Sequence, residues 1–236
     1  MEDYPKQVTK QCTQTILDQM DMNFMYKINE KEGKFSLGFF CHIKNKNKKI
    51  PIVVINNHIF DEENKDIINV SLNDKVKEIK LGNSKYRNKE FNISMVEIKE
   101  DEEYNFNFLE LDDDLYRDDV ELYYYKESIY IINYDKNNSV FVSYGLINNL
   151  NKSELIISGN INSNLNGYPI FNITNNKIIG IFNSNNKYFN KGIFFNYLIN
   201  EFINIPYNEI DIKITVKEDD LNFNLIIYSP TFSGTK

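Results

Sequence analysis

The sequence is short of several residue types, and each shortage excludes a class of protein. It has only two cysteines, Cys12 and Cys41, which form no CxxC pair, and only two histidines, His42 and His58. Two cysteines in 236 residues make no disulfide framework, so we expect free thiols in a reducing compartment. Because the cysteines and histidines follow no ligand spacing, the sequence predicts no zinc site. Nothing in it indicates a cofactor.

Long apolar runs and an excess of basic charge are also missing. No run approaches the roughly 18 apolar residues of a membrane-spanning helix, and residues 1–20 contain no apolar core of signal-peptide type. We therefore expect an intracellular, cytoplasmic protein with no membrane partner. The formal net charge of −7 argues against a nucleic-acid partner, because binding to phosphates needs a basic surface.

The sequence is instead rich in short β-type segments. It is 42% hydrophobic and 14% aromatic, and apolar runs alternate with turn residues. Many short strands at regular spacing, with little helix, predict an all-β sandwich or a pair of barrels. The expected strands are 22–29, 35–43, 51–55, 67–72, 76–81, 93–98, 128–134, 140–146, 155–157, 168–173, 177–182 and 192–195.

Two helices, a final strand pair and two connections complete this prediction. Residues 9–22 are expected to form a short N-terminal helix capped by Thr9, and residues near 196–204 have helical spacing. Residues 209–216 and 222–228 are expected to pair as strands. Residues 45–49 are interpreted as an exposed basic loop. Residues 109–119 are interpreted as a solvated acidic connection, because they lack the spacing and the turn glycine of a cation site.

Three segments carry a resemblance to a known family. In the stretch from Phe35 to Phe60, two apolar runs flank a basic loop, and the second run leads to His58. Phe91–Ile98 reads FNISMVEI, in which Asn92 precedes a strand-like run. Asn164–Ile170 reads NLNGYPI and is followed by the apolar run Ile178–Ile181. In this order, the three segments resemble the histidine corner, the aspartate strand and the nucleophile loop of the trypsin/chymotrypsin superfamily.

The resemblance implies an all-β fold of two antiparallel β-barrels, the trypsin-like double barrel. On this interpretation, residues 1–21 are an N-terminal segment and residues 22–111 form the first barrel. Residues 112–205 form the second barrel and its closing helix, and residues 206–236 form a C-terminal β-hairpin extension.

The resemblance also implies a degenerate catalytic triad. His58 falls on the catalytic base, Asn92 on the orienting aspartate and Asn166 on the nucleophilic serine, while Asn164 and Gly167 fall in the former oxyanion loop. The family's mechanism needs a hydroxyl for histidine to deprotonate and a carboxylate to stabilise the imidazolium. Asparagine supplies neither group, so we expect no intact catalytic residue and interpret the chain as a pseudoprotease.

Other residues offer alternative chemistry near these positions. On a strand, Glu90 would share a face with Asn92 at roughly 6.5 Å, and Ser163 would reach the nucleophile position only on another loop path. The ring of Tyr168 is expected to fill the space over the former site. Adjacent strand residues point to opposite faces, so Cys41 and His42 form no dyad. We expect Cys41 to be a buried thiol; the alternative is a redox or nucleophilic role.

Three functions follow from this interpretation. The first is a catalytically inactive protease homologue that acts as a protein-binding or scaffold module. The second is an atypical hydrolase that uses His58 with an unrecognised nucleophile. The third is a structural subunit of a larger assembly that docks through its C-terminal strands. All three are compatible with a protein or peptide partner, whose identity and stoichiometry the sequence leaves open.

Overall fold

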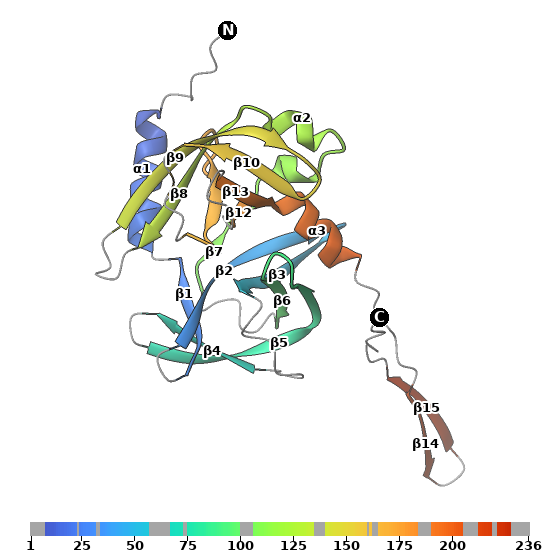
Figure 1. Cartoon of the computed structure of the whole chain (residues 1–236). Coiled ribbons are helices and arrows are strands. Elements are labelled where there is room, and N and C mark those ends of the chain that lie inside the picture. Colours follow the sequence, from blue (N-terminus) through green and yellow to red (C-terminus); the bar gives the residue numbers. More distant parts are fainter. Residues whose placement is uncertain are drawn as a thin grey trace. The chain divides into compact units, whose positions relative to one another are not determined.

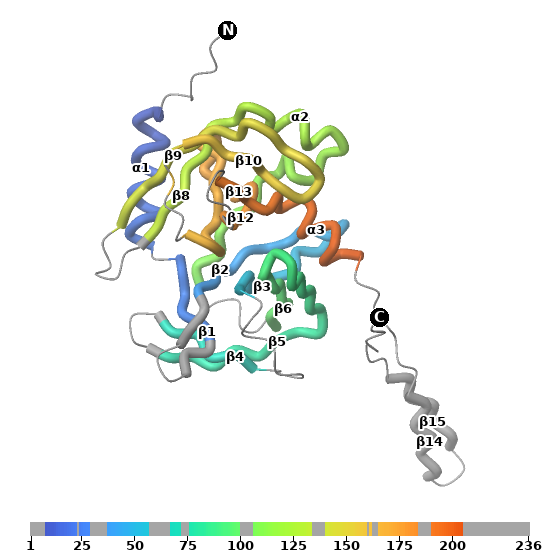
Figure 2. Tube along the Cα trace, in the orientation of Figure 1, coloured from blue at the N-terminus to red at the C-terminus, as the bar shows by residue number. Residues whose placement is uncertain are grey.

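The computed structural model divides the chain into two compact units, Met1–Ile203 and Asn204–Lys236 (Figures 1 and 2). The residues it describes are 8–22, 24–31, 34–56, 67–72, 75–99, 106–134, 140–159, 161, 165–183, 190–204, 212–218 and 221–227. No helix among these residues has the length and apolar character needed to cross a membrane.

The first barrel is a closed ring of six antiparallel strands. Its order is β1-β4-β5-β6-β3-β2, and a β1–β2 pairing closes the ring. A short strand, β7, adds to β2 in parallel. The interior is apolar, and Phe40, Val53, Ile79 and Val96 are fully buried in it. The strands are β1 Tyr26–Lys31, β2 Lys34–Asn45, β3 Lys48–Asn56, β4 Ile67–Leu72, β5 Lys75–Asn88, β6 Ile93–Ile98 and β7 Phe108–Leu109.

The second barrel also closes with six strands, in the order β10-β13-β12-β11-β8-β9. Strands β11 and β12 are buried along their whole length, as continuous apolar runs predict. Gly180 in β12 allows close strand packing, because a Cβ there would lie 2.8 Å from the carbonyl oxygen of Ile193. The strands are β8 Ser128–Tyr134, β9 Val140–Leu150, β10 Glu154–Ser158, β11 Pro169–Asn172, β12 Ile178–Phe182 and β13 Asn190–Phe194.

Helices cover parts of the second barrel. Helix α1, Lys10–Met22, begins at Thr9, whose Oγ1 accepts a hydrogen bond from the backbone N–H of Cys12 at 3.1 Å. This confirms the predicted cap. The helix runs along β8 (Figure 1), and Tyr130 of that strand donates to Gln19 Oε1 at 2.6 Å. The described part of the chain also contains the 3₁₀ helix η3, Asp113–Tyr116, and α2, Val120–Tyr124. Helix α3, Phe195–Ile203, matches the helix predicted near residue 196.

Two predicted connections differ from the structure. Residues 45–49 are not an open loop, because β2 continues to Asn45 and β3 begins at Lys48. The two-residue turn between them places Lys46 at a φ of 53°. Residues 109–119 are also not simply solvated. Leu111 bridges to Ile178 and Leu115 is fully buried, so apolar anchors hold this acidic segment against the second barrel.

The unit Asn204–Lys236 contains one antiparallel strand pair. Strand β14, Ile212–Glu218, pairs with β15, Leu221–Ile227, in a continuous register from Ile212↔Ile227 to Glu218↔Leu221. The prediction of a C-terminal strand pair is therefore confirmed, with each strand within a few residues of its expected place.

Candidate functional site

A small pocket of about 130 Å³ lies where residues of the two barrels meet. The sequence-predicted positions Asn92 and Asn166 both line it, although they belong to different barrels. His58, Ser163 and Asn164 lie outside the described residues. The described lining is Asn56, Phe91, Asn92 and Ile93 from the first barrel and Asn166, Gly167, Phe182 and Asn183 from the second.

Asn92 sits at the end of a tight turn between β5 and β6. Its φ is 53°, in the left-handed region that asparagine tolerates better than most residues. The turn is closed by the backbone N–H of Asn92, which donates to the carbonyl of Lys89 at 3.4 Å. A second hydrogen bond within the turn runs from the backbone N–H of Phe91 to Asn88 Oδ1 at 2.9 Å. The sequence thus fixes this turn with local amide hydrogen bonds.

The second barrel and its helix brace this turn. The amide of Asn183, which directly follows β12, donates from Nδ2 to the carbonyl of Phe91 at 3.1 Å. The ring of Phe91 meets Tyr197 of α3 edge-on, with centroids 5.9 Å apart. Asn183 was not predicted from the sequence. Its only signal is that it is the first polar residue after a strand of five buried residues.

The Asn166–Gly167 turn forms the facing side of the pocket. Gly167 has a φ of 91°, which favours glycine. Its backbone N–H donates to the carbonyl of Phe182 at 2.8 Å, so the turn is tied to the end of β12. A Cβ at Gly167 would lie 3.1 Å from Oδ1 of Asn56, the last residue of β3. The end of the strand that leads toward His58 therefore approaches this turn closely.

The described lining of the pocket is uncharged and mixes polar with apolar side chains. It contains four asparagines and no carboxylate, hydroxyl, thiol or basic side chain. Carboxamides donate and accept hydrogen bonds, and they neither ionise near neutral pH nor act as nucleophiles. These described side chains can hold a neutral polar group, but they cannot move a proton in the way a general base does.

No family model and no curated protein matches the sequence. Solved structures do match it. Deg5 aligns with a TM-score of 0.52 and 15% identity, over 83% of this chain and 95% of that chain. Rv3671c from M. tuberculosis H37Rv, crystallised as a serine-to-alanine mutant in an inactive form, aligns with a TM-score of 0.51 and 10% identity, over 84% and 94%. The inactive form of the Rv3671c protease gives 0.52 and 9%, over 84% and 96%.

Identities this low are informative about the fold alone. Together with the two closed six-strand antiparallel barrels, they confirm the predicted architecture. The chain has the trypsin-like double-barrel fold. Within this fold, the asparagine-lined pocket occupies the junction between the barrels.

Two residues weighed as part of the site are not among the described residues that line the pocket. Glu90 is exposed in the Asn92 turn and does not line the pocket. Tyr168 is also absent from the described lining and is only 5% exposed. Because His58 and Asn164 lie outside the described residues, the expectation that its ring fills the space over the former site stays a prediction. The backbone N–H of Tyr168 donates to the carbonyl of Leu165, and its carbonyl accepts a hydrogen bond from the N–H of Phe182. These two bonds fix its backbone just before β11. The ring is therefore buried with that strand.

Cys41 and His42 form no dyad in the described structure. They are neighbours on β2, paired with Ile52 and Pro51, and so face opposite sides of the strand. Cys41 is free and fully buried, and burial raises the pKa of its thiol, which keeps the thiol protonated near neutral pH. The ring of His42 stacks on Phe108 at 4.3 Å. No group of three or more metal-ligating side chains occurs among the described residues.

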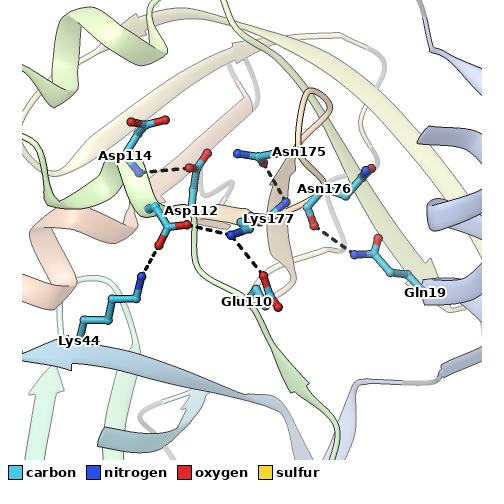
Figure 3. A network of polar contacts seen from close by, with 9 residues as sticks. Gln19, Lys44, Glu110, Asp112, Asp114, Asn175, Asn176 and Lys177 are labelled. Carbon is cyan, nitrogen blue, oxygen red and sulfur yellow. Dashed lines mark hydrogen bonds and ion pairs between the residues drawn. The ribbon is translucent and has the colours of Figure 1, made fainter. Parts of the chain in front are cut away.

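A separate polar network links the two barrels (Figure 3). Lys44 of β2 and Lys177, the residue before β12, both bind the carboxylate of Asp113, the latter at 2.9 Å. Lys177 also pairs with Glu110 at 3.2 Å. Hydrogen bonds from the two lysines lower the pKa of Asp113 to about 2. This carboxylate therefore remains ionised over the physiological pH range and holds a cation from each barrel.

Proposed function

We propose that the protein is a protein- or peptide-binding module with a trypsin-like fold that does not cleave peptide bonds. The observation that supports this is the described lining of the inter-barrel pocket, which has four asparagines and no carboxylate or hydroxyl. Asn92 and Asn166 stand where the resemblance places the orienting aspartate and the nucleophilic serine. Hydrolysis of the trypsin type needs both of those groups, together with the histidine.

The pocket has the size and chemistry to hold one side chain of a bound peptide. Its volume of about 130 Å³ is well below the roughly 300–1,000 Å³ of pockets that enclose drug-sized ligands. Both turns that form it are fixed by hydrogen bonds, at Phe91 and at Gly167. A rigid, amide-lined pocket favours a neutral polar side chain, because no described charge in it would offset the desolvation of an ion.

The competing proposal is a hydrolase that uses His58 with an unrecognised nucleophile. A fluorophosphonate probe and a peptide-hydrolysis assay separate the two, applied to the full chain, to His58→Ala and to the double variant Asn92→Asp/Asn166→Ser. We expect no labelling of the wild type. The double variant should gain labelling, and adding His58→Ala should remove that gain. Stoichiometric labelling of the wild type, or hydrolysis that His58→Ala abolishes, would overturn the binding proposal.

A second candidate function is docking through the C-terminal strands. The β14–β15 register places apolar residues opposite one another, from Ile212↔Ile227 through Ile214↔Leu225 to Val216↔Phe223. A lone two-stranded hairpin is marginally stable in water, so we propose that a partner adds to it. Deleting residues 207–236 should then abolish association in size-exclusion chromatography while the circular dichroism of the barrels persists. Unchanged association would remove this candidate.

A further inference from the structure

A groove of about 770 Å³ lies on the unit Met1–Ile203, and it shares no described lining residue with the asparagine-lined pocket. Part of its lining is the segment from Leu115 to Leu122, which includes the first residues of α2. The rest comes from α3 and from Lys152 and Ser153 before β10. Figure 1 shows α2, β10 and α3 grouped together on this part of the molecule.

The groove combines a buried apolar floor with an exposed apolar rim. Leu115, Val120 and Ile199 line it and are each almost fully buried. Leu122 on the rim is 82% exposed, more than any other large apolar side chain in the described part of the chain. Single exposed apolar residues are common, but a leucine at the edge of an apolar groove is typical of an interaction site.

The rim of the groove is acidic. Its lining contains four acidic side chains, Asp118, Asp119, Glu121 and Glu201, and two basic ones, Arg117 and Lys152, which gives −4 + 2 = −2. Arg117 is occupied, because its Nε donates to Asp119 at 2.8 Å and a second nitrogen lies 3.5 Å from Asp114. Asp118, Glu121 and Glu201 pair with no cation among the residues that the structure describes, so their charge is available to a ligand.

The acidic charge of the groove favours a basic binding partner. The C-terminal unit Asn204–Lys236 has five acidic and three basic residues, a net charge of 3 − 5 = −2. The whole chain carries −7, so a second copy would bring the same sign of net charge. We infer that this groove, which we call the α2–α3 groove, binds a segment of another protein that carries lysine or arginine beside leucine-like side chains. The inference rests on the proposal that the protein acts by binding other proteins.

Fluorescence anisotropy with two synthetic peptides tests this inference on the full chain. One probe is a short amphipathic peptide of leucine and lysine, and the other has glutamate in place of lysine. We expect only the lysine peptide to bind. Glu121→Lys/Glu201→Lys should weaken binding about tenfold or more, since each reversal replaces an attraction with a repulsion. Leu122→Ser should weaken it by a similar factor through lost apolar burial.

Matched variants outside the groove control for the acidic charge of the whole chain. Asp21→Lys/Glu78→Lys changes the net charge equally at exposed positions of α1 and β5, and Val76→Ser removes an apolar side chain that is 67% exposed. Both should bind the lysine peptide like the wild type. Equal weakening by groove and control variants, binding of the glutamate peptide, or no binding at all would overturn the inference. Fluorophosphonate labelling tests only the inter-barrel pocket, and peptide anisotropy tests only the α2–α3 groove. Failure of the proposed function is therefore distinguishable from failure of the groove inference.

Discussion

The carboxylate of Asp113 offers a test of how the two barrels are held together. It is the first residue of η3, and it binds Lys44 from the first barrel and Lys177 from the second. Asp113→Asn keeps the shape of the side chain and removes its charge. The variant therefore leaves both lysines in place and deletes the attraction that joins them.

The size of the effect follows from the pKa and from solvent exposure. A fall of the Asp113 pKa from 3.8 to about 2 would correspond to about 2.5 kcal/mol if all of it stabilised the fold. However, the Asp113 and Lys44 side chains are 58% and 51% exposed, and solvent screens such pairs. We therefore expect about 1 kcal/mol. Because the pKa of Asp113 is lower in the folded state, this stabilisation is present when the pH is above the ordinary aspartate pKa of 3.8. It is lost as the pH falls from there toward 2.

Urea unfolding of the wild type and Asp113→Asn across pH measures this directly. The wild type should be more stable by about 1 kcal/mol near neutral pH, and the difference should shrink from about pH 4 downward. High salt should reduce it as well, since the Debye length falls from about 10 Å at 0.1 M to about 3 Å at 1 M. Asp118→Asn, at an exposed aspartate outside the network, is the control. A difference that is independent of pH, or equal to that of the control, would refute the ionic link.

Two other predictions concern the scaffold around the pocket. Gly180→Ala should destabilise the protein by about 1–3 kcal/mol in urea unfolding, because its Cβ would lie 2.8 Å from the backbone oxygen of Ile193. Gly82→Ala is the matched control, since its nearest neighbours belong to one flexible side chain, and an equal cost would contradict the explanation. Asn183→Ala should cost about 1 kcal/mol and accelerate amide exchange in the Asn92 turn, because it removes the bond to Phe91. Unchanged exchange there would show that the bond does not brace the turn.

Local sequence patterns predicted the bounds of a strand well where a β-branched or aromatic run is flanked by turn residues. Ile67–Leu72, Ile93–Ile98 and Ser128–Tyr134 have their predicted bounds, because each is a β-branched or aromatic run between turn residues. Strand β5 extends far beyond its predicted end, to Asn88. Its second half is polar and continues only by pairing with β6, across an irregularity between Leu81 and Lys85. Such pairing depends on barrel closure, which local patterns do not encode.

The candidate site was predictable only in part. Asn92 and Asn166 followed from motif positions, and Asn56 lay in the histidine-corner segment without a predicted role. Asn183 carries no motif and reaches the pocket through barrel closure. Asp112 was interpreted with its acidic neighbours as solvated, yet it is 1% exposed and accepts a hydrogen bond from Asn172 at 3.2 Å. Leu111 and Leu115 are buried and anchor that segment. These two apolar residues were the feature of the sequence that distinguishes it from a solvent-exposed acidic loop.

The backbone at the pocket bears on whether the triad-restoring variant is a fair test. Asn92 has a φ of 53°, and aspartate tolerates this region about as well as asparagine, so Asn92→Asp changes the charge and leaves the turn in place. Gly167 keeps its positive φ beside position 166, and serine at 166 is smaller than asparagine. Both substitutions are therefore compatible with the present backbone. Gain of labelling in that variant, with none in the wild type, would assign the difference between the two proteins to these two side chains.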